Sequence, residues 1–225
     1  MSPEPRAIVT FLDYCEATNT NQFESVYRGV GDANCTLTPS VGRHCDPTVI
    51  ESYERDLLAL FKKHARLHLS VEPKDEWEWI ALAQHHGVPT RLLDWSRNPL
   101  VALFFAASSH RDKDGAVYVY ESRVIVDTSR TTDPFSAAPV GKYAPPLLDS
   151  RIVAQAGMFT FHPDPARPFE SDEVQKLIIP ATQKLDMTRR LAVFGITEAQ
   201  LFPGLDGIAQ FLRRLKGFDL PAARR

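Results

Sequence analysis

Apolar residues recur along the chain at two spacings, which predict a mixture of helices and short strands. An apolar residue every three or four positions is typical of a helix with one buried face. This period predicts helices over 48–69, 76–85 and 205–215, and shorter ones over 7–17, 184–191 and 197–202. The segment 99–107 is apolar on all sides, which indicates a buried helix.

Strand signals are shorter. The segment 115–121 is dominated by β-branched and aromatic residues and is the clearest strand. Weaker signals lie at 23–29, at 174–179, and at 151–161, where a turn or short helix leads into a strand. This order does not follow a βαβ repeat. It predicts a single α+β domain of short mixed or antiparallel strands packed by helices.

Proline and polar residues mark the less regular parts. The segment 125–150 contains four prolines and is expected to be a long surface loop, a candidate lid. We expect an N-terminal helix within 1–20, the main domain over 21–217, and a frayed tail over 218–225.

Composition narrows the class of protein. The chain has 225 residues, 44% apolar content and a net charge of −2, which suit one globular domain and give no argument for a membrane partner. No apolar run approaches the ~20 residues that span a bilayer, and the N-terminus lacks a signal-peptide layout, so we expect a cytoplasmic protein. Three cysteines argue against a disulfide framework. His64 and His68 have no third ligand at a matching spacing, so no metal is expected.

The first candidate site residue is Arg28, between Tyr27 and Gly29 at the end of a predicted strand. A guanidinium at this position can hold a phosphate or a ribose through two hydrogen bonds. The structural alternative is a surface arginine with a packed stem.

The second group lies in the polar segment before the buried helix. Thr90 and Arg91 are candidates to line a cleft. Asp94 has two interpretations: a cleft residue, or a structural group that pairs with Arg91 and caps the helix starting near Asn98. Ser96 is the alternative cap.

Two further residue groups carry possible chemistry. His85 and His86 are adjacent and so point in different directions; either one, with Asp94, could support hydrolysis. Arg151 and Gln155 form the other group. They either cap a strand entry, or Gln155 reaches the cleft and orients a substrate amide or hydroxyl.

These blocks resemble the FRG domain, a family named for a Phe/Tyr-Arg-Gly tripeptide, here Tyr27-Arg28-Gly29. The resemblance continues in Gln-His-x-Gly-x-x-Thr-Arg-Leu-Leu-Asp-Trp and the following Ala-Leu-x-Phe-Ala helix, over 84–106. Arg-x-x-x-Gln-x-Gly-x-Phe at 151–159 and Leu-Phe-Pro-x-Leu-x-Gly at 201–207 complete it. Together they cover most of the chain.

The block order is also similar, more distantly, to that of mono-ADP-ribosyltransferases, which use NAD. This resemblance implies a possible ADP-ribosyltransferase-like fold, with Arg28, Thr90 and Gln155 as catalytic residues. It implies an NAD-binding set of Tyr27, Arg28, Gly29, His86, Thr90, Arg91, Asp94 and Arg151. The chain departs from that pattern at Gln155-Ala156-Gly157, where a Gln/Glu-x-Glu would be expected.

The resemblance predicts an NAD-using transferase that acts as a bacterial effector or phage-defence toxin, with a protein or nucleic-acid acceptor. Two alternatives remain. One is a non-catalytic module that binds a nucleotide or a protein through the same cleft. The other is a hydrolase or nuclease built on Asp94 with His85 or His86.

Overall fold

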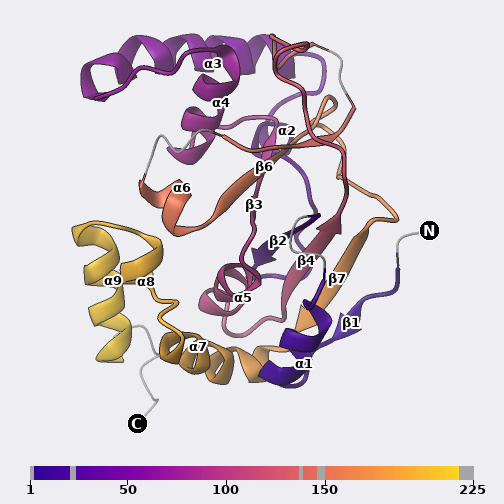
Figure 1. The fold of residues 1–225 in the computed structure, drawn as a ribbon, viewed down its shortest axis with the longest axis vertical. Helices are drawn as coiled ribbons and strands as arrows, with labels where there is room; N and C mark the ends of the chain where they lie inside the picture. Colours follow the sequence, from indigo (N-terminus) through magenta and orange to yellow (C-terminus); the bar gives the residue numbers. More distant parts are fainter. Residues whose placement is uncertain (1–2, 21–23, 137–138, 146–149, 218–225) are drawn as a thin grey trace.

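In the part of the chain that the structure describes, seven strands form one mixed sheet in the order β1-β7-β4-β2-β3-β6-β5 (Figure 1). The computed structural model describes residues 3–20, 24–136, 139–145 and 150–217. The strands are β1 (Arg6–Ala7), β2 (Ser25–Val30), β3 (Leu92–Ser96), β4 (Gly115–Glu121), β5 (Gly141–Tyr143), β6 (Gly157–Phe161) and β7 (Val174–Ile179). Neighbours are antiparallel except β1 and β7, which are parallel. The predicted α+β class is confirmed.

Nine α-helices and two short 3₁₀ segments surround the sheet in the described residues. The α-helices are α1 (Phe11–Ala17), α2 (Ser40–His44), α3 (Ile50–Ala65), α4 (Glu76–His85), α5 (Pro99–Ser108), α6 (Ser150–Ala154), α7 (Lys184–Val193), α8 (Glu198–Leu201) and α9 (Leu205–Leu215). The 3₁₀ segments are Arg66–His68 and Ala181–Gln183. The bounds of α4, α9, β4 and β7 are those the sequence predicts.

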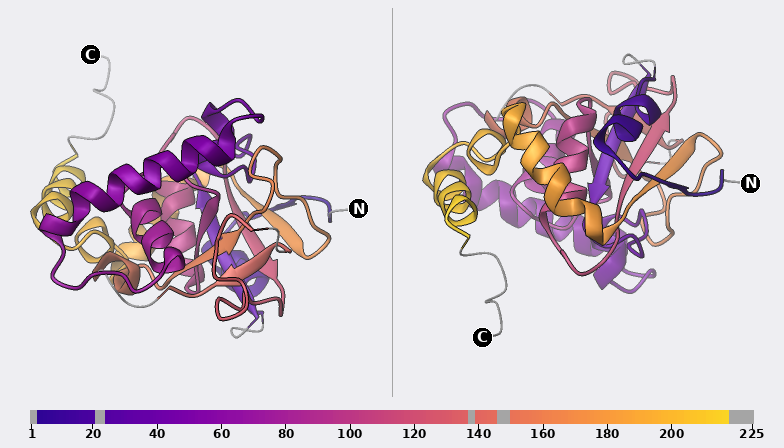
Figure 2. Two further views of the ribbon diagram at one scale, coloured as in Figure 1. Left: turned by 90° about the horizontal axis from the view of Figure 1, so that it is seen from above. Right: turned by 90° about the horizontal axis from the view of Figure 1, so that it is seen from below.

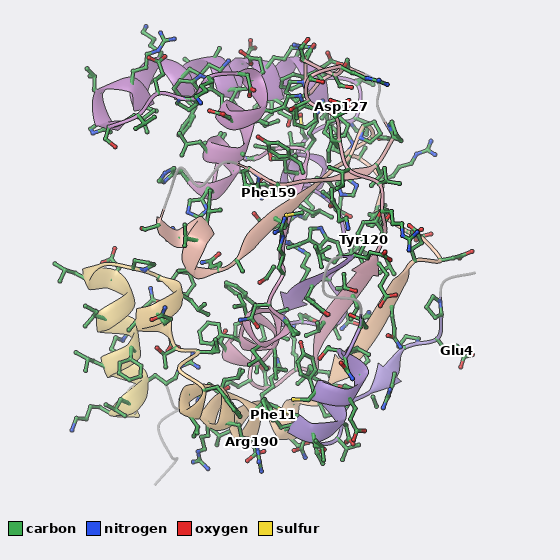
Figure 3. All side chains as sticks on the ribbon, viewed as in Figure 1. Glu4, Phe11, Tyr120, Asp127, Phe159 and Arg190 are labelled. Atoms are coloured by element: carbon green, nitrogen blue, oxygen red, sulfur yellow. The ribbon has the colours of Figure 1, made fainter. Side chains whose placement is uncertain are left out.

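The helices bury apolar side chains in separate clusters. One cluster gathers around α5, with Leu103 at 0% exposure, and includes side chains of α1, α7, β2 and β4. A second gathers around Trp77 of α4 and includes Phe159 and Phe161 of β6. Figure 3 shows Phe159 inside the molecule and Arg190, on α7, at its rim. The predicted buried helix over 99–107 is therefore confirmed.

Gly29 allows β2 and α5 to touch through their backbones. A Cβ at Gly29 would lie 1.8 Å from the carbonyl oxygen of Ala102 and 2.8 Å from the amide nitrogen of Ala106. No larger residue fits there without moving the strand or the helix. The glycine after Arg28 therefore allows α5 to pack directly on β2.

The structure corrects several sequence predictions of local structure. The segment 92–96, where the sequence patterns predict no strand, forms β3, and the predicted loop over 125–150 contains β5. Residues Arg6–Ala7, predicted to be near the start of a helix, form β1, and α1 begins after its cap Thr10. Asn98, rather than Asp94 or Ser96, caps α5 by accepting a hydrogen bond from the amide of Leu100 at 2.9 Å.

Two expectations fall partly or wholly outside the described residues. The predicted tail over 218–225 lies outside them, and so does Phe23 of the strand predicted at 23–29. Among the described helices, none combines the length and the apolar character needed to cross a membrane.

Candidate functional site

The sheet parts between β2 and β3. In the described residues β2 pairs with β4 through six registered positions, but with β3 only through Tyr27 and Ser96. Beyond that pair the guanidinium of Arg28 bridges the gap. Its Nη1 donates to the backbone carbonyl of Asp94 at 2.6 Å and lies 3.4 Å from the Asp94 carboxylate. A side chain thus links the strands where the ladder ends.

A cleft of about 320 Å³ opens at this parting. It receives side chains or backbone from β2, β3, α4, α5, α6 and the segment after α8. Its lining residues are Tyr27, Arg28, Gly29, Gln84, His85, Gly87, Asp94, Trp95, Ser96, Val101, Ala102, Phe105, Arg151, Gln155 and Phe202. The structure therefore brings together Arg28, Asp94, Arg151 and Gln155, which are far apart in the sequence.

Aromatic rings form one wall of the cleft. The rings of Phe105 and Phe202 meet edge to face with centroids 6.1 Å apart. The guanidinium of Arg151 lies 5.1 Å from the centre of the Phe202 ring, within cation–π range. Neither Phe105 nor Phe202 is among the site residues expected from the sequence. The Leu-Phe-Pro segment at 201–203 is the signal that could have pointed to Phe202.

Asp94 is held by a relay of hydrogen bonds that begins at Thr90. The Thr90 hydroxyl donates to Oε1 of Gln84 at 2.6 Å, and Nε2 of Gln84 donates to the Asp94 carboxylate at 2.9 Å. Thr90 is 1% exposed and does not line the cleft, whereas the Asp94 side chain is 53% exposed. Thr90 can therefore act on the site by positioning Gln84, another lining residue that the sequence analysis missed.

Arg91 belongs to a buried ion pair instead of the cleft. Its Nε donates to the Glu54 carboxylate at 2.9 Å, and its backbone amide donates to the same carboxylate at 2.6 Å. Burial raises the pKa of Glu54, although the charge of Arg91 and its hydrogen bonds act in the opposite direction. The alternative in which Arg91 pairs with Asp94 is wrong, because Asp94 pairs with Arg28. Arg91 thus ties β3 to α3.

The two adjacent histidines differ in their surroundings, although their rings meet edge to face with centroids 5.6 Å apart. His85 lines the cleft, whereas His86 is exposed at the end of α4, with its ring 6.4 Å from that of Phe61. In the described residues, no group of three His, Cys, Asp or Glu side chains could hold a metal ion.

Gln155 is fixed at the turn between α6 and β6. Its side-chain Nε2 donates to the backbone carbonyl of Leu201 at 3.0 Å, and its backbone carbonyl accepts from the Ser96 hydroxyl at 2.7 Å. Ala156 has a φ of +46°, a conformation that non-glycine residues rarely adopt. This strained turn holds the Gln155 amide at the cleft wall. The hydrogen bond to Leu201 connects that amide to the segment that contains Phe202.

The buried His162 is connected through hydrogen bonds to Trp95, a lining residue of the cleft. The indole of Trp95 donates to the Thr160 hydroxyl at 2.8 Å, and that hydroxyl lies 2.7 Å from Nε2 of His162. Burial, with a smaller effect of the Arg28 charge, lowers the pKa of His162 to about 3. His162 is therefore neutral at physiological pH, and it shares a hydrogen bond with the Thr160 hydroxyl.

Residues 24–115 match the model of the FRG domain. The chain carries an FRG domain. The matched segment contains Arg28, Gln84 and Asp94, while three other lining residues of this FRG domain protein, Arg151, Gln155 and Phe202, follow it in the sequence. Neither the curated proteins nor the solved structures include a match to the chain.

Proposed function

We propose that the cleft of this FRG domain binds NAD and that the protein is an ADP-ribosyltransferase-like enzyme. One observation carries the proposal. Arg28 and Asp94 meet across the parted strands, so that a cation and a half-exposed carboxylate share one cleft. NAD needs both charges, because its phosphates are anionic and its ribose becomes cationic when nicotinamide leaves.

The remaining walls suit the rest of such a ligand. The Phe105 and Phe202 rings offer an apolar surface for a flat heterocycle, and Arg151 adds a second guanidinium for phosphate. The cleft volume of about 320 Å³ lies at the lower end of ligand sites, which are ~300–1,000 Å³. We therefore place the nicotinamide ribose phosphate inside the cleft and the adenosine at its open side.

The chemistry would follow from the fixed charges. When the bond between nicotinamide and the ribose C1′ breaks, its electron pair leaves with nicotinamide and the ribose carries positive charge. The Asp94 carboxylate would stabilise that charge, since Gln84 and Arg28 hold it without reorganisation. Gln155 would orient a ribose hydroxyl or the acceptor, and Thr90 would act through Gln84.

Binding and turnover of NAD test the proposal together. We expect the purified protein to bind NAD and to release nicotinamide, and Arg28→Ala to lose both. Arg123→Ala is the matched control, because Arg123 is also paired with a carboxylate, that of Glu24, but its side chain is 84% exposed and does not line the cleft. Absence of NAD binding by the wild-type protein would overturn the proposal.

A non-catalytic nucleotide-binding module is the second candidate. It is favoured by the residues at the α6–β6 turn, since Gln155-Ala156-Gly157 offers an amide where the transferase pattern has a carboxylate. NAD binding that is lost in Arg28→Ala, without nicotinamide release, would select this candidate. The hydrolase alternative retains His85 and Asp94 as lining residues of one cleft, whereas His86 lies outside the cleft. Phosphodiester cleavage without NAD would select it.

A role as effector or defence toxin goes with the transferase. Production of the wild-type chain in a bacterial host should then slow growth, and production of Arg28→Ala should not. Equal growth at equal protein levels would count against that role and would leave the NAD assay to decide the activity.

A further inference from the structure

The outer face of α3, continued by its cap Val49 and by Leu67 of the 3₁₀ segment that follows, carries an apolar stripe that no other described element covers. Its members recur at the spacing of one helix face: Val49, Tyr53, Leu60 and Leu67, whose exposed fractions are 48%, 46%, 55% and 90%. We call them the α3 stripe. In the left view of Figure 2, α3 runs along the outside of the molecule in front of the other elements. Exposed apolar residues in one row are typical of a contact surface.

Charged residues beside the stripe differ from other charged residues of this region in their pairing. Arg55, Lys62 and Arg66 all form ion pairs within the chain. The side chains of Asp56, Lys63 and His64, which flank Leu60, make no hydrogen bond or ion pair to the described residues. The acidic member precedes Leu60 and the two basic members follow it.

We propose that the α3 stripe is the docking surface for a second copy of this chain, with the two α3 helices antiparallel about a two-fold axis at Leu60. A two-fold contact uses the same surface on both partners, so the surface must complement itself. With Leu60 opposite Leu60, each Tyr53 faces Leu67 of the second copy and each Asp56 faces His64, beside Lys63. The apolar residues then meet one another, and each unpaired acid meets unpaired bases.

The opposite orientation fits poorly. Parallel helices in register would place Asp56 against Asp56 and Lys63 against Lys63, and like charges at a contact disfavour it. Antiparallel packing also sets the dipoles of the two helices in opposition, which is favourable. The charge pattern of the stripe therefore selects the antiparallel dimer.

The contact is expected to be of modest size. A helix of 16 residues is about 24 Å long, and one pair of such helices buries less than the ~1,600 Å² of a standard interface. We expect a reversible dimer whose dissociation constant is on the order of micromolar.

Sedimentation velocity over a range of protein concentrations tests the dimer. The wild-type chain should shift from monomer to dimer as concentration rises, and Leu60→Asp should remain monomeric because it places two carboxylates on the two-fold axis. Leu212→Asp is the matched control, since Leu212 is an apolar residue of α9 exposed to 50%; it should dimerise like the wild type. A monomeric wild type, or equal loss in both variants, would overturn the proposal.

Charge reversal and cross-linking test the register. Asp56→Lys should weaken the dimer at least tenfold, and adding Lys63→Asp and His64→Asp should restore it. Under oxidising conditions Leu60→Cys should give a disulfide-linked dimer in excess of the wild type, whose Cys15, Cys35 and Cys45 provide the background. Tyr53→Cys should not, because its counterpart is Leu67. Failure of the triple variant to restore the dimer, or equal cross-linking at both positions, would contradict this register.

Discussion

The guanidinium of Arg28 donates to the backbone carbonyl of Asp94 at 2.6 Å and also lies beside the Asp94 carboxylate. Arg28 therefore contacts Asp94 through two different groups, the backbone carbonyl and the side-chain carboxylate. The backbone carbonyl is present whatever side chain the residue carries, whereas the negative charge depends on the carboxylate. Substitutions of the side chain can therefore test the charge while Arg28 keeps its main contact.

Asp94→Asn should leave the fold and NAD affinity nearly unchanged and lower the rate of nicotinamide release at least tenfold. The amide retains an oxygen for Gln84 but cannot stabilise a cationic ribose as a carboxylate does. Measurement of kcat and the dissociation constant for NAD checks this. A similar rate in the variant would remove Asp94 from the proposed mechanism.

Thr90→Val should lower NAD affinity and destabilise the protein by about 1–3 kcal/mol. It removes the hydroxyl that donates to Gln84 and accepts from the amide of Leu92. Thr90→Ser keeps the hydroxyl and should recover the affinity. Urea unfolding and NAD titration of both variants measure the two effects. If the serine variant recovers stability but not affinity, Thr90 does not position the site through Gln84.

Gly29→Ala should destabilise the protein by about 3 kcal/mol or more, because the new Cβ would meet the backbone of α5, which cannot rotate away. Gly157→Ala is the matched control in another β-strand, β6. Its nearest neighbours, in Ile152, would be 3.4 Å from the new Cβ, an ordinary contact. Thermal and urea unfolding should show a large loss for Gly29→Ala and a small change for Gly157→Ala. Similar losses would contradict the close approach of β2 and α5.

His162 should make stability fall with acidification. Because the folded protein lowers the pKa of His162 to about 3 from an ordinary value of 6.5, its contribution is complete above pH 6.5. As pH falls from 6.5 towards 3, the unfolded chain binds a proton that the folded chain excludes, so stability falls by about 1.4 kcal/mol per pH unit.

The variant His162→Gln isolates this effect, since its amide can donate to or accept from the Thr160 hydroxyl without titrating. Between pH 6.5 and pH 4 the unfolding free energy of the wild type should fall more than that of the variant. Urea unfolding at several pH values measures it. A difference that does not change with pH would mean that His162 titrates normally.

The sequence was most informative where a residue pattern is local. The β-branched and aromatic run of β4 and the amphipathic period of α9 predict their elements to the residue. The strand β3 was missed because Leu92-Leu93-Asp94-Trp95-Ser96 has no clear alternation and follows a turn. Its extended form depends on pairing with β6, a segment about 65 residues further along.

The candidate site likewise contains residues that local sequence predicts and contacts that only the fold determines. Arg28, Asp94, Arg151 and Gln155 were selected from their local settings, and the structure brings them to one cleft. The partner of Arg91 could not be read from sequence, because Glu54 resembles any other glutamate of an amphipathic helix until α3 packs against the start of β3. The hydrophobic pattern of α3 does not show that Glu54 is buried, because most other polar residues of this helix are exposed.

The strand order also determines how this chain can be divided. The segment that matches the FRG model ends at the first residue of β4, whose two neighbours in the sheet are β2 and β7. A fragment limited to 24–115 would lose nearly all of β4 together with β6 and β7, and so would expose the apolar faces of α4 and α5. Expression plasmids for any FRG domain of this architecture should therefore extend well past the family boundary, to the end of α9.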